Sequence, residues 1–321
     1  MCIRDRFKLD PAFKDYIWGG TRLRDEYGKK CDYDKVAESW ELSCHKDGPS
    51  VVADGEYKGL TLNEYIEKAG KGVLGKNCER FENFPILIKL IDAKDNLSVQ
   101  VHPDNDYAMR VEGEYGKTEM WYVVDCDEGA TLLYGFKHEI TKEEFARRIA
   151  DNTLLEVTNA VPVKKGDVFF IKSGTLHAIG KGILIAEIQQ NSNTTYRIYD
   201  YGRVGKDGKP RELHVDKALD VTKLAPAEQY PETPVEKKDG YDIKLLSKCE
   251  YFTTYRVNVE TKAELDADEN SFNSILVLEG EPVISGGETV SAKKGESVFI
   301  SAGTGKYTVE GKCTFVLTKI D

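Results

Sequence analysis

The segment Asn96-Leu97-Ser98-Val99-Gln100-Val101-His102-Pro103-Asp104 alternates apolar and polar side chains. In a β-strand, alternate residues lie on the same face. Val99 and Val101 are therefore predicted to face a core, while Gln100 and His102 point together to the other side. A buried sheet face seldom keeps two polar, metal-capable side chains next to each other without a use. We therefore take this segment as the start of a functional site around which the fold is organised.

Two later segments add ligands of the same kind. Glu119 stands near the start of a second predicted strand, and His177 ends a strand and tight turn that begin at Phe170. Two imidazoles, a carboxylate and an amide oxygen suit zinc or another borderline divalent ion, and the lack of thiolates argues against a purely structural zinc. We interpret Gln100, His102, Glu119 and His177 as the ligands of one metal ion. The alternative is that both histidines are satisfied core residues and that Glu119 is a solvated strand end.

The composition is that of an ordinary globular protein in two parts. A length of 321 residues is too great for one ordinary core and predicts two domains. A net charge of -10 argues against a nucleic-acid partner, which needs a basic face, but leaves room for a small anionic substrate. No apolar run is long enough to span a membrane, and no signal peptide is visible. The seven scattered cysteines are interpreted as free thiols. Together, the free thiols and the lack of a membrane span or signal peptide predict a cytoplasmic protein without a membrane partner.

The order of predicted elements indicates barrels with insertions. Many short strands separated by glycine turns predict an antiparallel barrel or jelly roll. Two helical insertions are marked by predicted capping boxes, Thr61 with Glu64 and Thr141 with Glu144. Prolines gather among Glu, Lys and Ala in residues 226–239, which are therefore predicted to connect two domains.

An internal repeat predicts that both domains are copies of one β-barrel unit. Residues 164–175, KKGDVFFIKSGT, match residues 293–304, KKGESVFISAGT. The copies differ at the turn histidine, because His177 aligns with Lys306. The second copy, residues 240–321, contains no histidine at all. The first barrel is therefore predicted to hold the metal, and the second is predicted to bind none.

The spacing of these ligands resembles the cupin motifs, which have a ligand-x-His pair, a following glutamate and a glycine-rich turn that ends in histidine. Gln100 takes the place of the first histidine, and in this the chain is similar to type I mannose-6-phosphate isomerases. The resemblance covers nearly the whole chain except residues 1–6, which we interpret as foreign or misassigned. The runs that carry it are SVQVHPD (98–104), GKTEMW (116–121), GTLHA (174–178), EIQQNSNTTYR (187–197) and YDY (199–201), together with 13–20, the strand around Trp40 and 211–215.

The resemblance implies an all-β fold of two cupin-type jelly-roll barrels with small helical insertions. It divides the chain into a metal-binding catalytic cupin domain (1–225), a connecting segment (226–239) and a C-terminal cupin-like domain without metal (240–321). It implies interconversion of D-mannose 6-phosphate and D-fructose 6-phosphate through an enediol, with one zinc ion per chain, or cobalt or manganese in its place. A monomer or a homodimer is expected.

The implied reaction needs a base that takes a carbon-bound proton. Lys117 precedes Glu119 by two residues on one predicted strand, so it shares a face with that ligand, and Glu187 is the second candidate. Arg197 is the candidate anion contact, either for a phosphate or for the enediolate oxygen. Two further residues are candidate phosphate contacts, Ser98 and Lys172.

Two other functions stay open on the sequence alone, an iron-dependent cupin oxidoreductase and a non-catalytic sugar-binding or regulatory cupin. An oxygenase would more often show three histidines with a carboxylate, so Gln100 weighs against it. A binding module would not need Lys117 and Glu119 beside Arg197. The plain alternative for Lys117 is a solvated lysine at a strand edge. The other histidines are interpreted as structural or exposed, namely His45, His138 and His214.

Overall fold

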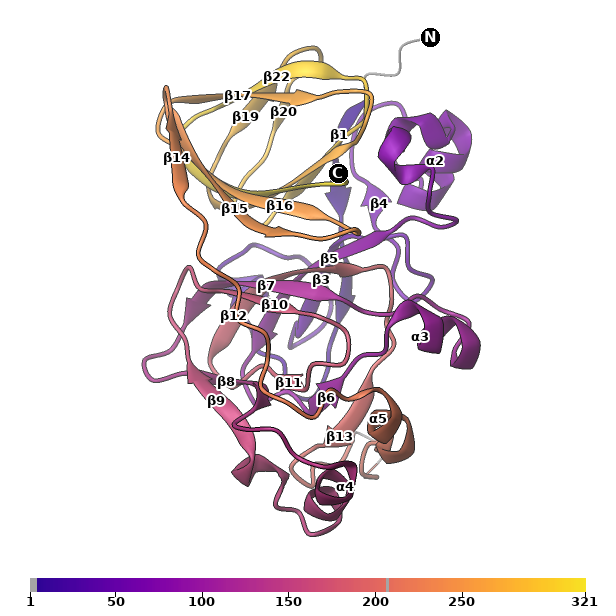
Figure 1. Cartoon of the computed structure of the whole chain (residues 1–321). Helices are drawn as coiled ribbons and strands as arrows, with labels where there is room; N and C mark the ends of the chain where they lie inside the picture. Colours follow the sequence, from indigo (N-terminus) through magenta and orange to yellow (C-terminus); the bar gives the residue numbers. More distant parts are fainter. Residues whose placement is uncertain (1–4, 206–207) are drawn as a thin grey trace.

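The protein forms two β-sheet lobes stacked one above the other. The structure, a computed structural model, describes residues 5–205 and 208–321. Figure 1 shows a lower lobe built mainly from the first two thirds of the chain and an upper lobe built mainly from the last third. Neighbouring strands pair antiparallel in both lobes. The prediction of an all-β fold with small helical insertions is confirmed.

The lower lobe is a sandwich of two sheets, the layering expected of a jelly roll. One sheet has six strands in the order β10 (Val168–Ile171), β7 (Glu119–Cys126), β12 (Ile183–Gln190), β5 (Ile86–Ala93), β3 (Glu38–Leu42) and β2 (Ala12–Lys14). The other has five strands in the order β13 (Tyr196–Tyr199), β6 (Val99–Val101), β11 (His177–Ala178), β8 (Thr131–Phe136) and β9 (Thr158–Pro162).

The upper lobe repeats this two-sheet plan. Its large sheet has eight strands in the order β14 (Val235–Lys238), β15 (Tyr241–Lys248), β16 (Thr253–Val259), β23 (Cys313–Lys319), β18 (Asn273–Gly280), β21 (Ser297–Ile300), β1 (Arg6–Asp10) and β4 (Val51–Val52). Its small sheet has four strands in the order β17 (Lys262–Ala267), β22 (Gly305–Glu310), β19 (Val283–Ser285) and β20 (Val290–Ser291).

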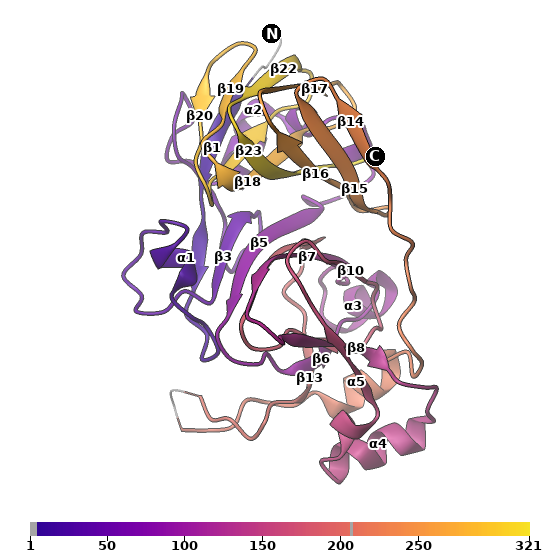
Figure 2. The ribbon, with the colours of Figure 1, turned by 90° about the vertical axis from the view of Figure 1, so that its left-hand side faces the viewer.

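The sheet pairing differs from the predicted division of the chain in two places. Strands β1 and β4 belong to the first predicted domain, 1–225, but they extend the large sheet of the upper lobe. Phe7 and Leu9 of β1 add apolar side chains to the core between the lobes, which explains why the strand crosses over. The predicted connecting segment, 226–239, runs along one side of the molecule (Figure 2) and already contains β14.

Within residues 5–205 and 208–321, five short α-helices and three 3-10 turns connect the strands. At α2, Thr61 accepts from the backbone N–H of Glu64 and the Glu64 side chain accepts in return, so the first predicted capping box is confirmed. At α4, Thr141 caps Glu144, but the Glu144 side chain accepts from Arg148, so the reciprocal half of the second box is wrong. The helices are α1 (Arg22–Asp25), α2 (Leu62–Ala69), α3 (Asn105–Val111), α4 (Lys142–Ala150) and α5 (Val215–Val221), and the turns are η1 (Lys71–Leu74), η2 (Lys76–Cys78) and η3 (Leu154–Glu156).

The internal repeat folds the same way in both lobes. Each copy begins with a tight turn whose glycine has a left-handed backbone, with φ of +91° at Gly166 and +87° at Gly295. Each glycine N–H donates to a neighbouring strand at 2.8 Å, to the carbonyl of Val123 in one lobe and of Val277 in the other. Strands β10 and β21 follow these turns. The repeat predicted from the sequence is therefore confirmed as a structural repeat.

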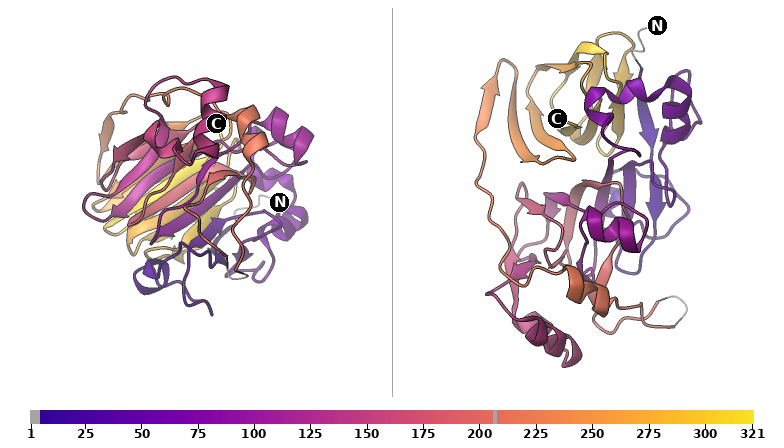
Figure 3. Two further views of the ribbon diagram at one scale, coloured as in Figure 1. Left: turned by 90° about the horizontal axis from the view of Figure 1, so that it is seen from below. Right: turned by 45° about the vertical axis from the view of Figure 1, so that its right-hand side comes forward.

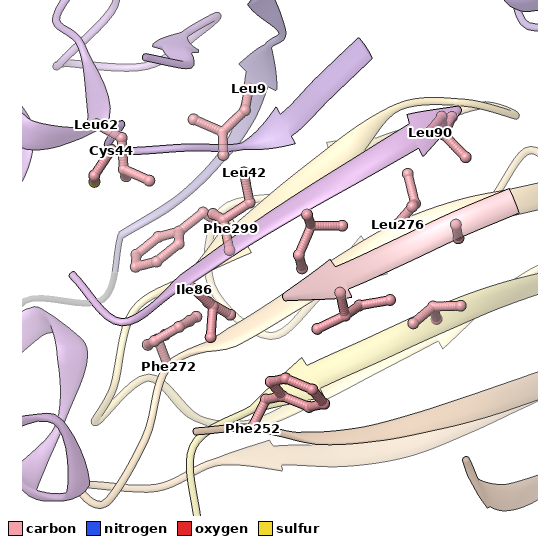
Figure 4. Packing of buried hydrophobic residues seen from close by; sticks show 14 of the residues in the cluster. Leu9, Leu42, Cys44, Leu62, Ile86, Leu90, Phe252, Phe272, Leu276 and Phe299 are labelled. Carbon is pink, nitrogen blue, oxygen red and sulfur yellow. The ribbon is translucent and has the colours of Figure 1, made fainter. Parts of the chain in front are cut away.

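The six-stranded sheet is buried on both faces, which fixes the place of the functional site. On β5, Ile86, Ile88 and Leu90 point into a core shared with the upper lobe, whereas Lys89 lines a cavity inside the lower lobe. Figure 4 shows this shared core, where β5 meets upper-lobe residues such as Phe299. Burial of each such side chain contributes about 1.5–3 kcal/mol, so the three on β5 outweigh any exposed ion pair. Viewed from below, the facing sheets lie over one another as layers (Figure 3).

A buried ion pair fastens the two lobes. Lys29 Nζ lies 2.6 Å from Glu41 Oε1 and donates at 2.5 Å to the carbonyl of Gly295 in the upper lobe. Both charged side chains are buried. Because removing one partner leaves the other charge buried and unpaired, Lys29→Met is expected to lower the free energy of unfolding by about 3–5 kcal/mol. Urea denaturation at neutral pH measures the change.

The matched control for this prediction is Lys76→Met. Lys76 Nζ pairs with Glu269 Oε1 at 3.5 Å, and both of these side chains are largely exposed. Exposed pairs contribute about 0–1 kcal/mol, so this substitution should change stability little. Equal losses for Lys29→Met and Lys76→Met would contradict a special role for the buried pair.

The start of the chain is partly described. Of the six residues interpreted as foreign, 1–4 lie outside the described residues. Asp5 accepts from the hydroxyl of Tyr65 at 2.9 Å, and Arg6 opens β1 and donates to the carbonyl of Glu288 at 2.8 Å. These two residues are thus built into the upper lobe.

Two predictions about the environment can be compared with the structure. The six cysteines in the described ranges are all free, in line with the interpretation as unpaired thiols. Within those same ranges, no helix combines the length and the apolar character that crossing a membrane requires.

Candidate metal centre and active site

Three of the predicted ligands meet inside the lower lobe, between its two sheets. Glu119 opens β7, His102 directly follows β6, and His177 opens β11. The Nε2 atoms of His102 and His177 lie 3.1 Å apart. Glu119 Oε1 lies 3.4 Å from His177 Nε2, and Glu119 Oε2 lies 3.7 Å from His102 Nε2. The three side chains are fully buried, and together they form a potential metal site.

The hydrogen bonds of the two histidines show which nitrogen is free to bind an ion. Nδ1 of His102 lies 2.8 Å from the carbonyl oxygen of Thr194, and Nδ1 of His177 lies 2.8 Å from that of Thr175. A carbonyl only accepts, so each Nδ1 carries the proton and each Nε2 presents a lone pair. Burial lowers the pKa of His102 well below its usual value and that of His177 to about 4, so both rings are neutral.

This arrangement fits a divalent cation. Two lone pairs that face each other at 3.1 Å repel, and a cation between them removes the repulsion. Glu119 Oε1 is buried without a hydrogen-bond partner among the described residues, which is costly unless an ion or a water molecule satisfies it. Carbonyl partners that fix the ring orientation are typical of metal-binding histidines.

Gln100, the fourth predicted ligand, lies beside the same cluster. It pairs with His177 across β6 and β11, and its side-chain amide lies 3.4 Å from His177 Nε2. Ser98 Oγ donates to Gln100 Oε1 at 3.3 Å. Rotation of the amide by a half turn exchanges its oxygen and nitrogen and would direct the oxygen toward the histidines. Gln100 is thus in place for a fourth ligand, and its role stays a prediction.

A row of alternating charges continues from the ligands along the inner face of the six-stranded sheet. Lys117 Nζ donates to Glu119 Oε2 and lies 3.6 Å from Glu187 Oε1. Lys89 Nζ lies 3.4 Å both from Glu187 Oε1 and from Glu38 Oε2. All five side chains are buried. Two lysines against three glutamates leave one negative charge uncompensated, and a bound cation would offset it.

The charges in this row set one another's protonation. Burial and the nearby Glu187 raise the pKa of Glu119. Burial alone would raise the pKa of Glu187, but Lys117 and Lys89 outweigh burial and lower it. Burial alone would lower the pKa of Lys89, but Glu38 and Glu187 outweigh it and raise it. Glu187 is therefore held as a carboxylate, the form that accepts a proton, and Lys89 is held as an ammonium.

Four of these five side chains line a cavity of about 240 Å³, namely Glu38, Lys89, Lys117 and Glu187. A polar cavity of this size suits a small polar metabolite better than a large apolar ligand. It brings together five of the predicted site residues, Ser98, Gln100, Lys117, Glu187 and Arg197. The other lining residues are Tyr16, Trp18, Glu38, Lys89, Ile91, Leu97, Ile179, Asn193, Thr195 and Arg211.

Lys172 lies apart from this group. Its side chain is half exposed and pairs with Glu228 at 3.8 Å. It directly follows β10, whose last residue, Ile171, points into the lower lobe. Neighbouring residues of a strand point to opposite sides, so Lys172 faces away from the cavity. The structure therefore does not bring Lys172 to the other predicted substrate contacts.

Two arginines lie together at the cavity wall. Arg197 Nε donates to Ser98 Oγ at 3.3 Å, and burial and the charge of Arg211 lower the pKa of Arg197. Arg211 is held by Asp200, which also accepts from Arg203. An anion between Arg197 and Arg211 would relieve their repulsion, so this end of the cavity is suited to bind one.

Sequence reasoning missed several lining residues. Lys89 interrupts the apolar run at the start of β5. A single lysine in such a run was itself a signal, because a strand buried on both faces can carry a charge only beside a partner. Trp18 and Arg211 lie in segments that carried the family resemblance, but nothing in their local pattern points to a cavity.

Two family models match separate parts of the chain. The model of the phosphomannose isomerase type I catalytic domain matches residues 6–129, and that of the mannose-6-phosphate isomerase cupin domain matches residues 242–320. The chain is 39% identical to mannose-6-phosphate isomerase ManA of Bacillus subtilis (strain 168) over 312 residues, 97% of each chain. The chain belongs to the type I phosphomannose isomerase family.

Two further members of this family support the assignment. The chain is 40% identical to a mannose-6-phosphate isomerase of Streptococcus mutans. The match extends over 291 residues, which is 88% of each chain. The crystal structure of mannose 6-phosphate isomerase from Bacillus subtilis matches with a TM-score of 0.92 at 38% identity, over 98% of this chain and 99% of that chain. The resemblance drawn from the ligand spacing and the cupin-type fold of the family are thereby confirmed.

Proposed function

We propose that this protein interconverts D-mannose 6-phosphate and D-fructose 6-phosphate through an enediol, with a divalent metal ion at the His102, Glu119 and His177 cluster. The observation that carries the proposal is that a buried lysine, a buried carboxylate and two arginines line one polar cavity, namely Lys117, Glu187, Arg197 and Arg211. Lys117 also contacts His102 and Glu119 of the cluster, which places the cluster directly behind the cavity wall. Proton transfer between neighbouring carbons needs a base, a stabiliser of oxygen charge and an anion contact for the phosphate. The cavity offers each of them.

The donor set of the cluster favours zinc, with cobalt or manganese as substitutes. His102, Glu119 and His177 would hold the ion, with Gln100 as the fourth ligand. When bound, the ion would supply Lewis-acid stabilisation of the substrate's oxygen charge. The buried site around it excludes bulk water, which strengthens every charge interaction with the substrate.

The chain's own residues would move the proton. Lys117 and Glu187 line the cavity, and Lys117 Nζ lies 3.6 Å from Glu187 Oε1. One of the two would take the proton from the first carbon and return it to the second, and their short separation lets them share it. Lys89 and Trp121 hold Glu187 in place, Lys89 by its charge and Trp121 through an N–H donated at 2.8 Å.

Arg211 and Arg197 would hold the phosphate. If so, Arg211→Ala should raise KM for mannose 6-phosphate roughly tenfold or more, equivalent to about 1.4 kcal/mol, because a charge-assisted hydrogen bond is lost. The matched control is Arg203→Ala, since Arg203 shares Asp200 with Arg211 but is not a cavity-lining residue. Equal KM values for both variants would contradict this assignment.

The proposed function is tested by supplying mannose 6-phosphate to the metal-loaded protein and following fructose 6-phosphate. The expected result is fructose 6-phosphate from mannose 6-phosphate, and mannose 6-phosphate when fructose 6-phosphate is supplied instead. Oxygen consumption with an oxidised product would favour the iron-dependent oxidoreductase instead. Binding without turnover would favour the sugar-binding module.

The setting of this reaction is also a proposal. A phosphorylated sugar as substrate and free cysteines agree with a place in the cytoplasm. A monomer or a homodimer stays the prediction for the assembly. That the C-terminal lobe binds no metal also stays a prediction, motivated by Lys306 at the position of the turn histidine.

A further inference from the structure

The loop that orients His102 is itself held by one carboxylate. The carbonyl oxygen of Thr194 accepts a hydrogen bond from His102 Nδ1. The neighbours of Thr194, Asn193 and Thr195, line the cavity. Glu114, in the connection between α3 and β7, reaches across to this loop. Its Oε2 accepts from the backbone N–H of Asn193 at 3.0 Å and from two hydroxyls of the loop, Thr194 Oγ1 at 3.1 Å and Ser192 Oγ at 3.3 Å.

The other oxygen of Glu114 is held by a buried histidine. His45 Nε2 lies 3.0 Å from Glu114 Oε1, and His45 Nδ1 accepts from the backbone N–H of Asp47 at 3.1 Å. Because Nδ1 accepts, Nε2 carries the proton and donates to Glu114. The side chain of Asn193 also donates to Asp47 at 2.9 Å. Residues on three separate segments therefore converge on the loop 192–194.

We infer that Glu114, held by His45, is a positioning residue for the metal centre: it fixes the loop 192–194 and thereby the carbonyl that orients His102. The inference rests on the metal site of the proposed function. Partners one shell outside the ligands typically change metal affinity 10–100-fold when they are removed. Glu114 acts one step further out, so an effect near the lower end of that range is expected.

A carboxylate is required at this position. Its two oxygens receive four donors, three from the loop and one from His45. The hydrogen bond from His45, with those from Asn193 and Thr194, lowers the pKa of Glu114 to about 2, so the group is ionised. In Glu114→Gln, the amide NH₂ must face either His45 or the loop. Either orientation puts two donors against each other, so the contact is lost although the size is kept.

The experiment compares wild type, Glu114→Gln and the control Glu144→Gln. Glu144 has a similar exposure and pairs with Arg148 at 3.3 Å on α4, away from the cavity. Zinc affinity is measured by competition with a chromophoric chelator. Amide hydrogen exchange is measured on metal-free protein, in peptides that cover residues 191–195. Glu114→Gln should bind zinc roughly tenfold more weakly and exchange faster in those peptides, whereas Glu144→Gln should match wild type in both.

A milder variant guards against a failure of Glu114→Gln to fold. Thr194→Val removes only one hydroxyl donor to Glu114 and leaves the carbonyl of residue 194 in place. It should shift zinc affinity and loop exchange in the same direction by a smaller factor. Unchanged exchange in both variants would overturn the inference.

The outcomes separate this inference from the proposed function. If wild type binds zinc and the dissociation constant of Glu114→Gln for zinc lies within twofold of the wild-type value, the inference is overturned and the metal site stands. Weaker zinc binding without faster exchange over 191–195 also overturns it, because the effect would not pass through the loop. If wild type binds no metal, the proposed function fails, and the exchange data on metal-free protein still decide whether Glu114 holds the loop.

Discussion

Lys117→Met is expected to lower turnover of mannose 6-phosphate at least roughly a hundredfold, the low end for a positioned acid or base. The substitution removes the amine but keeps much of the apolar stem, so the metal should stay bound. Lys117 Nζ lies 3.2 Å from His102 Nε2 and donates to Glu119. Lys117 therefore borders the proposed metal site and also lines the cavity in which the substrate would bind.

The companion variant, Glu187→Gln, decides between the two candidate bases. The measurement is exchange of the substrate's carbon-bound proton with heavy water, together with metal content and turnover. If Lys117 is the base, Lys117→Met loses this exchange. Normal exchange in Lys117→Met, with exchange lost in Glu187→Gln, would transfer the role to Glu187, which is already held as a carboxylate. Lys117 would then hold a substrate oxygen.

His177→Ala and His102→Ala are each expected to lose the metal and to lower turnover by roughly a thousandfold, equivalent to about 4 kcal/mol of lost transition-state stabilisation. Removal of either ring leaves too few ligands for a tight divalent site. Metal content by elemental analysis and turnover with added zinc measure the effect. The control is His138→Ala, since His138 is exposed and outside the cluster.

The fold of both histidine variants should survive at moderate temperature. The lower lobe has its own apolar core, which includes Ile91, Val123 and Ile185, none of them a ligand in the cluster. Metal binding should therefore add to stability without being its sole source. Full activity after chelation would contradict the metal-dependent mechanism, and unfolding of the metal-free protein would make the site a structural one.

The part of the site that the sequence predicted is the part that rests on local geometry. Strand alternation predicted that Gln100 and His102 share one face and that Lys117 and Glu119 share another. This prediction needs only the sequence spacing, because alternate residues of a strand lie on the same face. The capping signal at Thr61 and the repeated glycine turns are local in the same sense, and the structure confirms them.

The parts that the sequence did not predict depend on long-range pairing. Arg211 lines the cavity and is held there by a hydrogen bond to Asp200. No local sequence pattern predicts that contact. The pairing of β1 with β21 joins residues near opposite ends of the chain, so neither strand's own sequence specifies its partner. Lys172 shows the opposite case: it stands close before the turn that ends in His177, but its parity after β10 points it outward.

That pairing of β1 with β21 also constrains how the molecule can be made. Leu9 is opposite Ser297 in the large sheet of the upper lobe, and at about 5–20 residues per second a ribosome needs roughly 15–60 s to synthesise the chain between them. During this time β1 has β4 as its only partner from that sheet within the described residues. Phe7 can pack on Tyr65, but its second ring partner, Phe299, has not yet been made. Strand β1 is thus made long before its partner β21, and the large sheet of the upper lobe closes only after β21 has been translated.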